Sequence, residues 1–264
     1  MRKLTTRSVE KPWGRTELPA PFGRSDGARI GEVWFEDAVP QPLLLKYIFT
    51  SERLSIQVHP NDAQAQAEGY PHGKEECWYV LDAEPGATIG IGTTQPLTGD
   101  ELHAAALDGS LEHLVDWKPV RAGDFFHIPT GTVHAIGAGI TLAEIQQNVD
   151  LTYRLYDYGR PRELHLESGV IASRAEPYAL PAFNAAPGTV CDFPVPDSAP
   201  FRVAIIRWDA GDQIGVNDGW FLPLAGSGDG WAAGDCMRGD MAAADAPGHG
   251  LLAHWVEEPS GPGA

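Results

Sequence analysis

Two short segments hold side chains that suit metal and proton-transfer chemistry. In an extended strand successive side chains point to opposite faces, so Ser55, Gln57 and His59 share one face of the segment 55–59. The same alternation puts Lys74 and Glu76 on one face of the segment 73–79. An amide, an imidazole, a carboxylate and an amine on two such faces could hold a divalent cation and move a proton.

A third segment supplies a second histidine at a characteristic spacing. It reads Gly123-Asp-Phe-Phe-His-Ile-Pro129-Thr-Gly131-Thr-Val-His134, which is a turn, a strand, a Pro-x-Gly corner and a histidine that begins the next strand. The intervals resemble the second motif of the cupins, whose histidine is a metal ligand. The first cupin motif fits loosely, because Gln57 stands where that motif has a histidine.

Several motifs together resemble the type I phosphomannose isomerases, also called mannose-6-phosphate isomerases. The resemblance covers roughly residues 9–172, and the motifs occur in the family's order. They are Lys-Pro-Trp-Gly at 11–14, Gln-x-His-Pro at 57–60, Gly-Lys-x-Glu-x-Trp-Tyr at 73–79, Glu-Ile-Gln-Gln-Asn at 144–148 and Thr-Tyr-Arg-Leu-Tyr-Asp at 152–157.

The resemblance implies that Gln57, His59, Glu76 and His134 hold one zinc ion per chain. The chemistry of these side chains agrees with that expectation. Two imidazoles, one carboxylate and one amide oxygen suit a borderline divalent metal and leave positions for water or substrate oxygens.

The resemblance also implies that Ser55, Lys74 and Arg154 face a sugar phosphate, with Arg160 at the rim. Arginine offers a planar fork to phosphate oxygens and lysine a compact charge. The implied reaction interconverts mannose 6-phosphate and fructose 6-phosphate by moving a proton between C2 and C1 through an enediol. Lys74, Glu144 and Arg154 are the catalytic candidates, and either Lys74 or Glu144 is the base.

Simpler roles exist for each of these residues. The histidines could be ordinary core histidines, Lys74 a surface charge, and Arg154 a structural partner of Asp150 and Asp157. Two other functions also remain open: a different metal cupin, such as a dioxygenase or another sugar-phosphate isomerase, and a non-catalytic sugar-phosphate-binding cupin.

Composition narrows the class of partner. The chain has 19 Lys+Arg against 36 Asp+Glu, a formal charge of -17, which disfavours nucleic acid and anionic membranes as partners. A phosphate site must therefore be local. We expect a cytoplasmic protein with no membrane span and three unpaired cysteines. No pattern in the sequence indicates an oligomeric state.

The elements that must position these residues are short strands. We predict an all-β dominated fold, a cupin (jelly-roll) barrel at 1–175 with short helices at 62–68, from 98 towards 114, and at 161–173. A connector at 176–200 leads to a smaller, degenerate cupin-like β domain at 201–258 without metal ligands and a tail at 259–264. The predicted strands are Ile30–Phe35, Leu43–Phe49, Leu54–His59, Cys77–Leu81, Thr88–Ile91, Asp124–Pro129, Val133–Ile136 and Thr141–Gln146.

Overall fold

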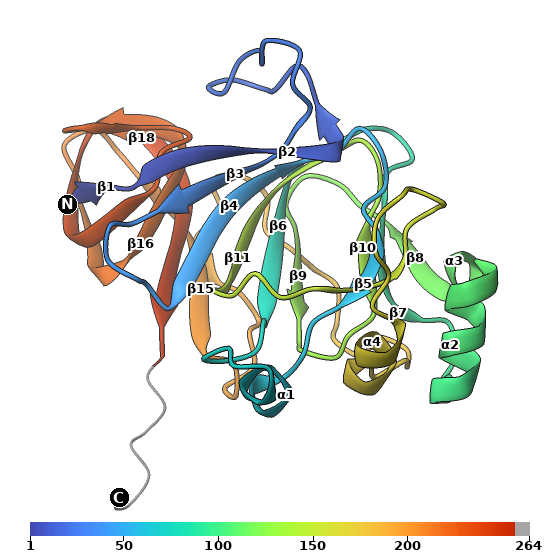
Figure 1. Cartoon of the computed structure of the whole chain (residues 1–264). Coiled ribbons are helices and arrows are strands. Elements are labelled where there is room, and N and C mark those ends of the chain that lie inside the picture. The colour runs from blue at the N-terminus through green and yellow to red at the C-terminus, as the bar shows by residue number, and fades with distance from the viewer. Residues whose placement is uncertain (257–264) are drawn as a thin grey trace, which may run out of the picture.

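The computed structural model describes residues 1–256 and is built mostly of strands (Figure 1). Within this range the elements are β1 (Arg2–Lys3), β2 (Thr5–Arg15), β3 (Ile30–Glu36), β4 (Leu43–Phe49), β5 (Ile56–Val58), α1 (Asp62–Ala67), β6 (Glu76–Ala83), β7 (Thr88–Thr93), α2 (Gly99–Asp108), α3 (Leu111–Leu114), β8 (Val115–Pro119), β9 (Asp124–Ile128), β10 (His134–Ile136), β11 (Ile140–Gln147), β12 (Tyr153–Tyr156), α4 (Leu166–Ala172), β13 (Phe183–Asn184), β14 (Cys191–Asp192), β15 (Phe201–Trp208), β16 (Gln213–Gly228), β17 (Trp231–Ala232) and β18 (Met237–Trp255).

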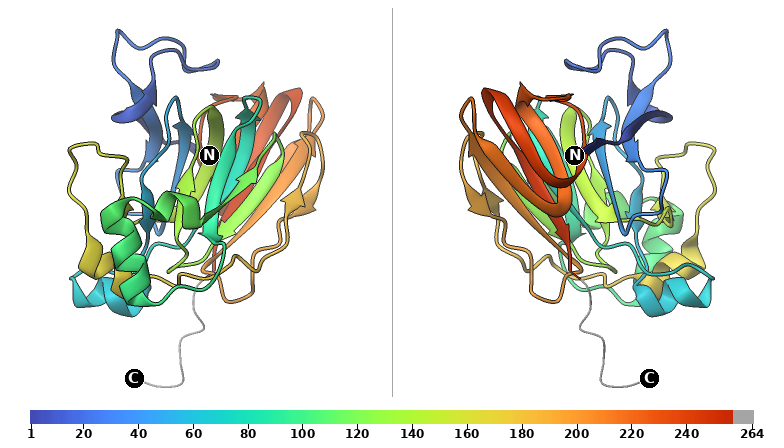
Figure 2. Two further views of the ribbon diagram at one scale, coloured as in Figure 1. Left: turned by 90° about the vertical axis from the view of Figure 1, so that its right-hand side faces the viewer. Right: turned by 90° about the vertical axis from the view of Figure 1, so that its left-hand side faces the viewer.

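The strands of the described range form three open sheets. A five-stranded sheet has the order β12-β5-β10-β7-β8, and a seven-stranded sheet has the order β13-β9-β6-β11-β4-β3-β2. A third sheet, β14-β15-β18-β16-β17, also receives β1 beside β18. Figure 2 shows the sheets stacked side by side, with the third sheet, in orange and red, on the side away from the helices.

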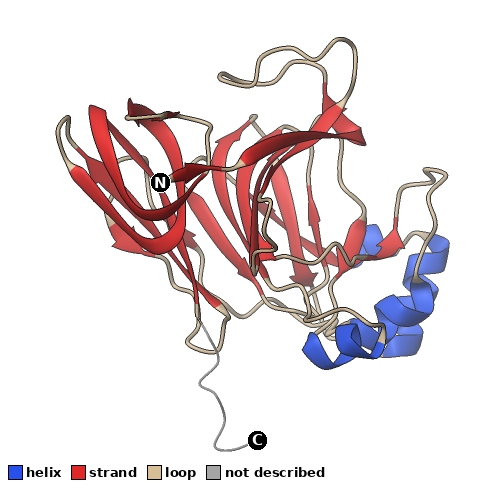
Figure 3. Ribbon diagram, turned by 60° about the vertical axis from the view of Figure 1, so that its left-hand side comes forward, coloured by secondary structure: helices blue, strands red, loops and turns tan. Residues whose placement is uncertain are grey.

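The outer face of the five-stranded sheet packs against helices. Ile56 and Val58 of β5 and Leu155 of β12 share a buried cluster with Leu102 and Ala105 of α2. Figure 3 shows the helices gathered at this side of the molecule. Because side chains alternate along β5, burying Ile56 and Val58 against the helices turns Gln57 to the opposite, inner face.

The central strands of the seven-stranded sheet, β4 and β11, are buried on both faces, which explains the almost unbroken apolar sequence of β4. Leu45 of β4 packs with Phe201 and Leu222 of the third sheet. Ile48, on the other face of β4, packs with Ile89 of the five-stranded sheet. The inner faces of these two sheets therefore enclose the space in which the site lies.

The predicted helices form, with local capping that explains where they begin. Asn61 and Gln64 make a capping box at α1, and Thr98 and Glu101 make one at α2. The helical segment predicted from residue 98 continues as α3 after a turn at Gly109 with φ +82°, and the third predicted helix is the shorter α4.

Among the strands of residues 1–175, the sequence pattern misses β1, β2, β8 and β12. Most side chains of β2 are exposed, so its sequence does not alternate between apolar and polar residues. β12 has only four residues, although it carries Arg154.

The segment predicted as a connector crosses between the sheets. Within it, β13 pairs with β9 of the seven-stranded sheet, and β14 pairs with β15 of the third sheet. The division into two domains stays a prediction. The predicted tail at 259–264, and residues 257–258 of the predicted second domain, lie outside the described residues. Among the described residues, no helix has both the length and the apolar character needed to cross a bilayer.

Candidate metal centre and active-site cavity

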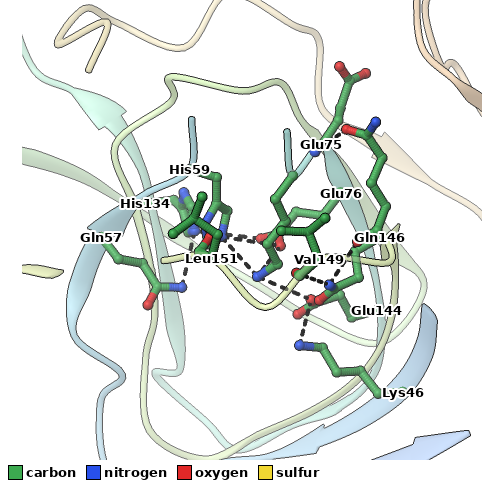
Figure 4. Close-up of polar contacts among 12 residues, drawn as sticks. Lys46, Gln57, His59, Glu75, Glu76, His134, Glu144, Gln146, Val149 and Leu151 are labelled. Carbon is green, nitrogen blue, oxygen red and sulfur yellow. Dashed lines mark hydrogen bonds and ion pairs between the residues drawn. The ribbon is translucent and has the colours of Figure 1, made fainter. Parts of the chain in front are cut away.

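Strand register brings the predicted site residues together. Gln57 of β5 lies opposite His134 of β10 on one side and Arg154 of β12 on the other. In the facing sheet, Glu144 of β11 lies opposite Lys46 of β4. Figure 4 shows Gln57, His59 and His134 on one side of the site, with Glu144 and Lys46 on the other.

Three of the four predicted metal ligands form a compact buried cluster. One ligand atom from each of His59, Glu76 and His134 lies within 4.8 Å of the others. His59 Nε2 is 3.3 Å from Glu76 Oε2, and His134 Nε2 is 3.5 Å from Glu76 Oε1. All three residues are buried.

Both imidazoles are oriented by backbone carbonyls. The Nδ1–H of His59 donates to the Leu151 carbonyl at 3.1 Å, and that of His134 donates to the Thr132 carbonyl at 2.8 Å. In this tautomer each Nε2 carries a lone pair, and both lone pairs point towards Glu76. Three acceptor groups that face one another attract a cation; the Lys74 ammonium, 3.1 Å from His59 Nε2 and Glu76 Oε2, meets part of that requirement, and the donor set also suits a divalent metal.

The ionisation states agree with that arrangement. Burial, followed by the nearby charge of Lys74, lowers the pKa of His59 to about 3, and burial also lowers the pKa of His134. Burial opposes ionisation of Glu76, but its neighbours, chiefly the charged Lys74, outweigh that effect, so the pKa of Glu76 lies well below its usual value. Neutral imidazoles and an ionised carboxylate are the ligand forms a divalent metal needs.

Gln57 lies beside this cluster. Its Nε2 is 3.3 Å from His134 Nε2, and its Oε1 accepts a hydrogen bond from Ser55 Oγ at 3.2 Å. A metal takes the amide oxygen, so a ligand role for Gln57 requires the amide to turn by about 180° about its last torsion, which exchanges the two similar atoms.

Lys74 connects the cluster to Glu144 in a buried row of alternating charges. Its Nζ is 3.1 Å from both His59 Nε2 and Glu76 Oε2, and 4.0 Å from Glu144 Oε1. Lys46 Nζ lies 2.9 Å from the same Glu144 oxygen. Burial and the charge of Glu76 raise the pKa of Glu144 to about 7 against the opposing effect of Lys46.

A cavity of about 200 Å³ opens beside these residues. Among the described residues, its walls include Ser55, Gln57, Lys74, Glu144 and Arg154. Arg160 is not among the described lining residues; its guanidinium lies 2.7 Å from Asp157 Oδ1 and donates to the Arg53 carbonyl at 2.8 Å.

The cavity is locally cationic in a chain of formal charge -17. Among the described residues, its wall contains five cationic and three acidic side chains. The cationic residues are Lys11, Lys46, Lys74, Arg154 and Arg162, and the acidic ones are Glu32, Glu144 and Asp150. This is the local positive site that the sequence requires for an anionic ligand.

Sequence reasoning missed Lys46, Glu32, Lys11 and Arg162 as parts of this wall. Lys46 carries a usable signal, because a lysine within the otherwise apolar Leu43–Phe49 strand is hard to bury without a partner. Its partners, Glu144 and Glu32 at 2.9 and 4.0 Å, come from neighbouring strands that no local pattern links to it.

Comparison with known proteins identifies the family of the chain. No family model matches the sequence. The chain is 46% identical over 156 residues to mannose-6-phosphate isomerase ManA of Bacillus subtilis, a match that covers 56% of this chain and 46% of that protein. It is 34% identical over 212 residues to B. subtilis YvyI, whose name places it among the mannose-6-phosphate isomerases, and this match covers 64% of the chain and 67% of YvyI.

Solved structures show the same architecture. A crystal structure of the mannose 6-phosphate isomerase from Bacillus subtilis matches with a TM-score of 0.81 at 27% identity, covering 96% of this chain and 98% of that one. A zinc-bound mannose 6-phosphate isomerase matches with a TM-score of 0.68 at 15% identity, covering 95% of this chain and 98% of that one, and so shows the fold alone.

The two facing sheets with the buried cluster between them are therefore a cupin fold of the phosphomannose isomerase type, which confirms the predicted fold class. The chain belongs to the mannose-6-phosphate isomerase family. The matched regions span about half the length of the first curated relatives, 42% and 46%.

Proposed function

We propose that the chain is an aldose-ketose isomerase that interconverts mannose 6-phosphate and fructose 6-phosphate. The observation that carries this proposal is the buried His59, Glu76 and His134 cluster beside a cationic cavity lined by Lys74 and Arg154. A metal centre by itself would indicate only a cupin. The combination with cationic side chains suits a phosphorylated substrate whose reaction passes through an anionic intermediate.

The residues present fit one divalent metal ion, for which zinc is our assignment. Glu76 Oε2 is buried with the Lys74 ammonium at 3.1 Å, and two neutral Nε2 atoms face the same carboxylate. His59, Glu76 and His134 would hold the ion, with the oxygen of Gln57 as a fourth ligand after its amide turns. When bound, the ion supplies Lewis-acid stabilisation of negative charge on a substrate oxygen.

Glu144 and Lys74, both on the cavity wall, have different roles in the proposed proton transfer. With a pKa raised to about 7, Glu144 is present as a carboxylate in a substantial fraction of molecules at neutral pH and can still release a proton it has accepted. We assign it as the base that carries the proton between C2 and C1. The ammonium of Lys74, 3.1 Å from Glu76 Oε2 on the cavity wall, is placed to stabilise the developing oxyanion.

Arg154 and Ser55 are assigned to the substrate. Arg154 is half-buried on the cavity wall, and its Nε donates to the Glu163 carbonyl at 2.8 Å, which leaves the outer end of its guanidinium for phosphate oxygens. Ser55 is buried on the same wall and can exchange its hydrogen bond with Gln57 for one to a sugar hydroxyl.

The test combines metal content with turnover. Protein purified without added chelator is analysed for metals and assayed with mannose 6-phosphate in a coupled assay, then stripped with chelator and reloaded with zinc. We expect about one metal ion per chain, loss of turnover on stripping and recovery on reloading.

A matched pair of variants locates the effect. Glu76→Gln removes the buried carboxylate of the cluster, whereas Glu75→Gln changes its neighbour on the opposite face, which pairs with His127. We expect metal and turnover to be lost in E76Q and kept in E75Q. Turnover that stays at background in zinc-loaded, folded protein, together with tight binding of mannose 6-phosphate by calorimetry, would replace our proposal with a non-catalytic binding protein.

A further inference from the structure

Two arginines after β12 share one carboxylate but face different surroundings. Asp157 is buried, and its Oδ1 lies 2.7 Å from Arg160 Nη2. Arg162 approaches the same carboxylate with two parallel hydrogen bonds, from Nε to Oδ2 at 2.6 Å and from Nη2 to Oδ1 at 2.7 Å. Of these two arginines, Arg162 lines the cavity, whereas Arg160 donates to the backbone carbonyl of Arg53.

The cavity wall therefore carries two guanidinium groups, those of Arg154 and Arg162. Burial, followed by the nearby charge of Arg162, lowers the pKa of Arg154, so the two cations are close enough to repel each other. Hydrogen bonds hold both guanidinium groups in place, because Arg154 donates to the Glu163 carbonyl and Arg162 donates to the Asp157 carboxylate. Two like charges fixed at one wall are stabilised by an anion placed between them.

We propose that Arg162, oriented by Asp157, binds the phosphate group of the substrate together with Arg154. The inference rests on the proposed function for its substrate and deepens it by adding a specificity-determining residue. Arg162 meets Asp157 through Nε and Nη2, so its Nη1 remains to donate to a phosphate oxygen. Asp157 acts as a positioning residue, since the paired guanidinium loses little rotational freedom when the anion arrives.

A purely structural explanation makes a different prediction. If the two arginines only neutralise Asp157 and stabilise the loop, replacing either of them should lower stability by a similar amount and affect phosphate binding equally. If Arg162 binds phosphate, its loss weakens phosphate-dependent binding, and the loss of Arg160 does so much less.

The experiment compares Arg162→Gln with Arg160→Gln, with Arg207→Gln as a charge-matched control on the exposed side of β15. For each protein we measure kcat and KM with mannose 6-phosphate, the Kd of inorganic phosphate by calorimetry, and the midpoint of thermal unfolding. Removing a charge-assisted hydrogen bond to phosphate should raise the KM and the phosphate Kd of R162Q by about ten- to a hundredfold, with kcat changed less.

The effect of R162Q must exceed that of R160Q by about tenfold or more, at similar thermal midpoints, while R207Q matches the parent protein. Equal effects of R162Q and R160Q, or a phosphate Kd in folded R162Q within about twofold of the parent value, would overturn the inference.

The phosphate measurement keeps this inference separate from the isomerase proposal. If the parent protein binds phosphate through Arg162 but does not turn over mannose 6-phosphate, the role of Arg162 is supported and the proposed isomerase activity is contradicted. If the parent protein turns over mannose 6-phosphate but its phosphate binding does not depend on Arg162, only the role of Arg162 is contradicted.

Discussion

The two faces of the seven-stranded sheet differ in purpose: one packs against the third sheet, and the other lines the cavity. Along β11, Ala143 and Ile145 pack against the third sheet, whereas Glu144, between them, points into the cavity. Along β4, Leu45 and Tyr47 face the third sheet, and Lys46 faces the cavity. A one-residue step along a strand thus separates a side chain that stabilises the fold from one that serves the site.

The difference shows how a charged cavity can be kept inside a small β protein. Burying Lys46, Glu144 and Glu32 is costly even when they are paired, because the desolvation of ions can exceed their mutual attraction. The apolar contacts on the outer face of the same strands offset that cost, at roughly 25 cal/mol for each Å² of apolar surface buried. We therefore expect substitutions on the two faces to separate activity from stability.

The largest expected effect comes from the inner face at His134. His134→Ala removes one of the two Nε2 atoms that face Glu76, and turnover should fall on the order of a thousandfold as the metal is lost. Metal analysis and the coupled assay measure this, with unfolding of chelator-treated parent and variant as the control for folding. Parent-level metal retention in H134A would remove His134 from the ligand set.

On the face of the seven-stranded sheet that packs against the third sheet, we expect a substitution to lower stability and leave turnover unchanged. Ile145→Ala leaves a cavity between the seven-stranded sheet and the third sheet and should lower the free energy of unfolding by about 2–5 kcal/mol. At temperatures where the variant stays folded, its turnover should match that of the parent protein. Denaturant unfolding measures the first quantity, and a large drop in kcat of the folded variant would show that the two faces are not independent.

The pH profile tests the base on the inner face. A base must be ionised to accept a proton, and the pKa of Glu144 is raised to about 7, so kcat/KM should fall as the pH drops through about 7. Lys46 lowers the pKa of Glu144, hence Lys46→Met should move this acidic limb to higher pH by about one unit or more. An acidic limb that stays in place in K46M, or that survives in Glu144→Gln, would assign the base elsewhere.

The smallest effect is expected away from both faces. Thr98 caps α2 on the far side of the five-stranded sheet, and Thr98→Ala should cost about 1 kcal/mol of unfolding free energy through loss of the cap. Turnover and phosphate affinity should be those of the parent protein. A change in either would mean that the helices on this side are coupled to the cavity.

The sequence by itself determined which residue types are candidate ligands and on which strand faces they lie. The alternation in 55–59 and 73–79 predicts which side chains share a face, and Ile56 and Val58 do pack away from the cavity. The spacing from Gly123 to His134 predicts the strand, corner and histidine, since local backbone rules control each of them. Family motifs added Glu144 and Arg154 and suggested a role for Lys74, and all three line the cavity.

Only the tertiary structure decided which charges share one wall. Lys46 meets Glu144 through pairing of β4 with β11, and no sequence period encodes that register. Arg160 and Arg162 are two residues apart and bind the same carboxylate, yet one of them reaches the cavity and the other a backbone carbonyl. Side-chain periodicity is a local property, whereas the neighbours that set charge, burial and pKa come from strands distant in the chain, so the site's electrostatics follow from the packing of the sheets.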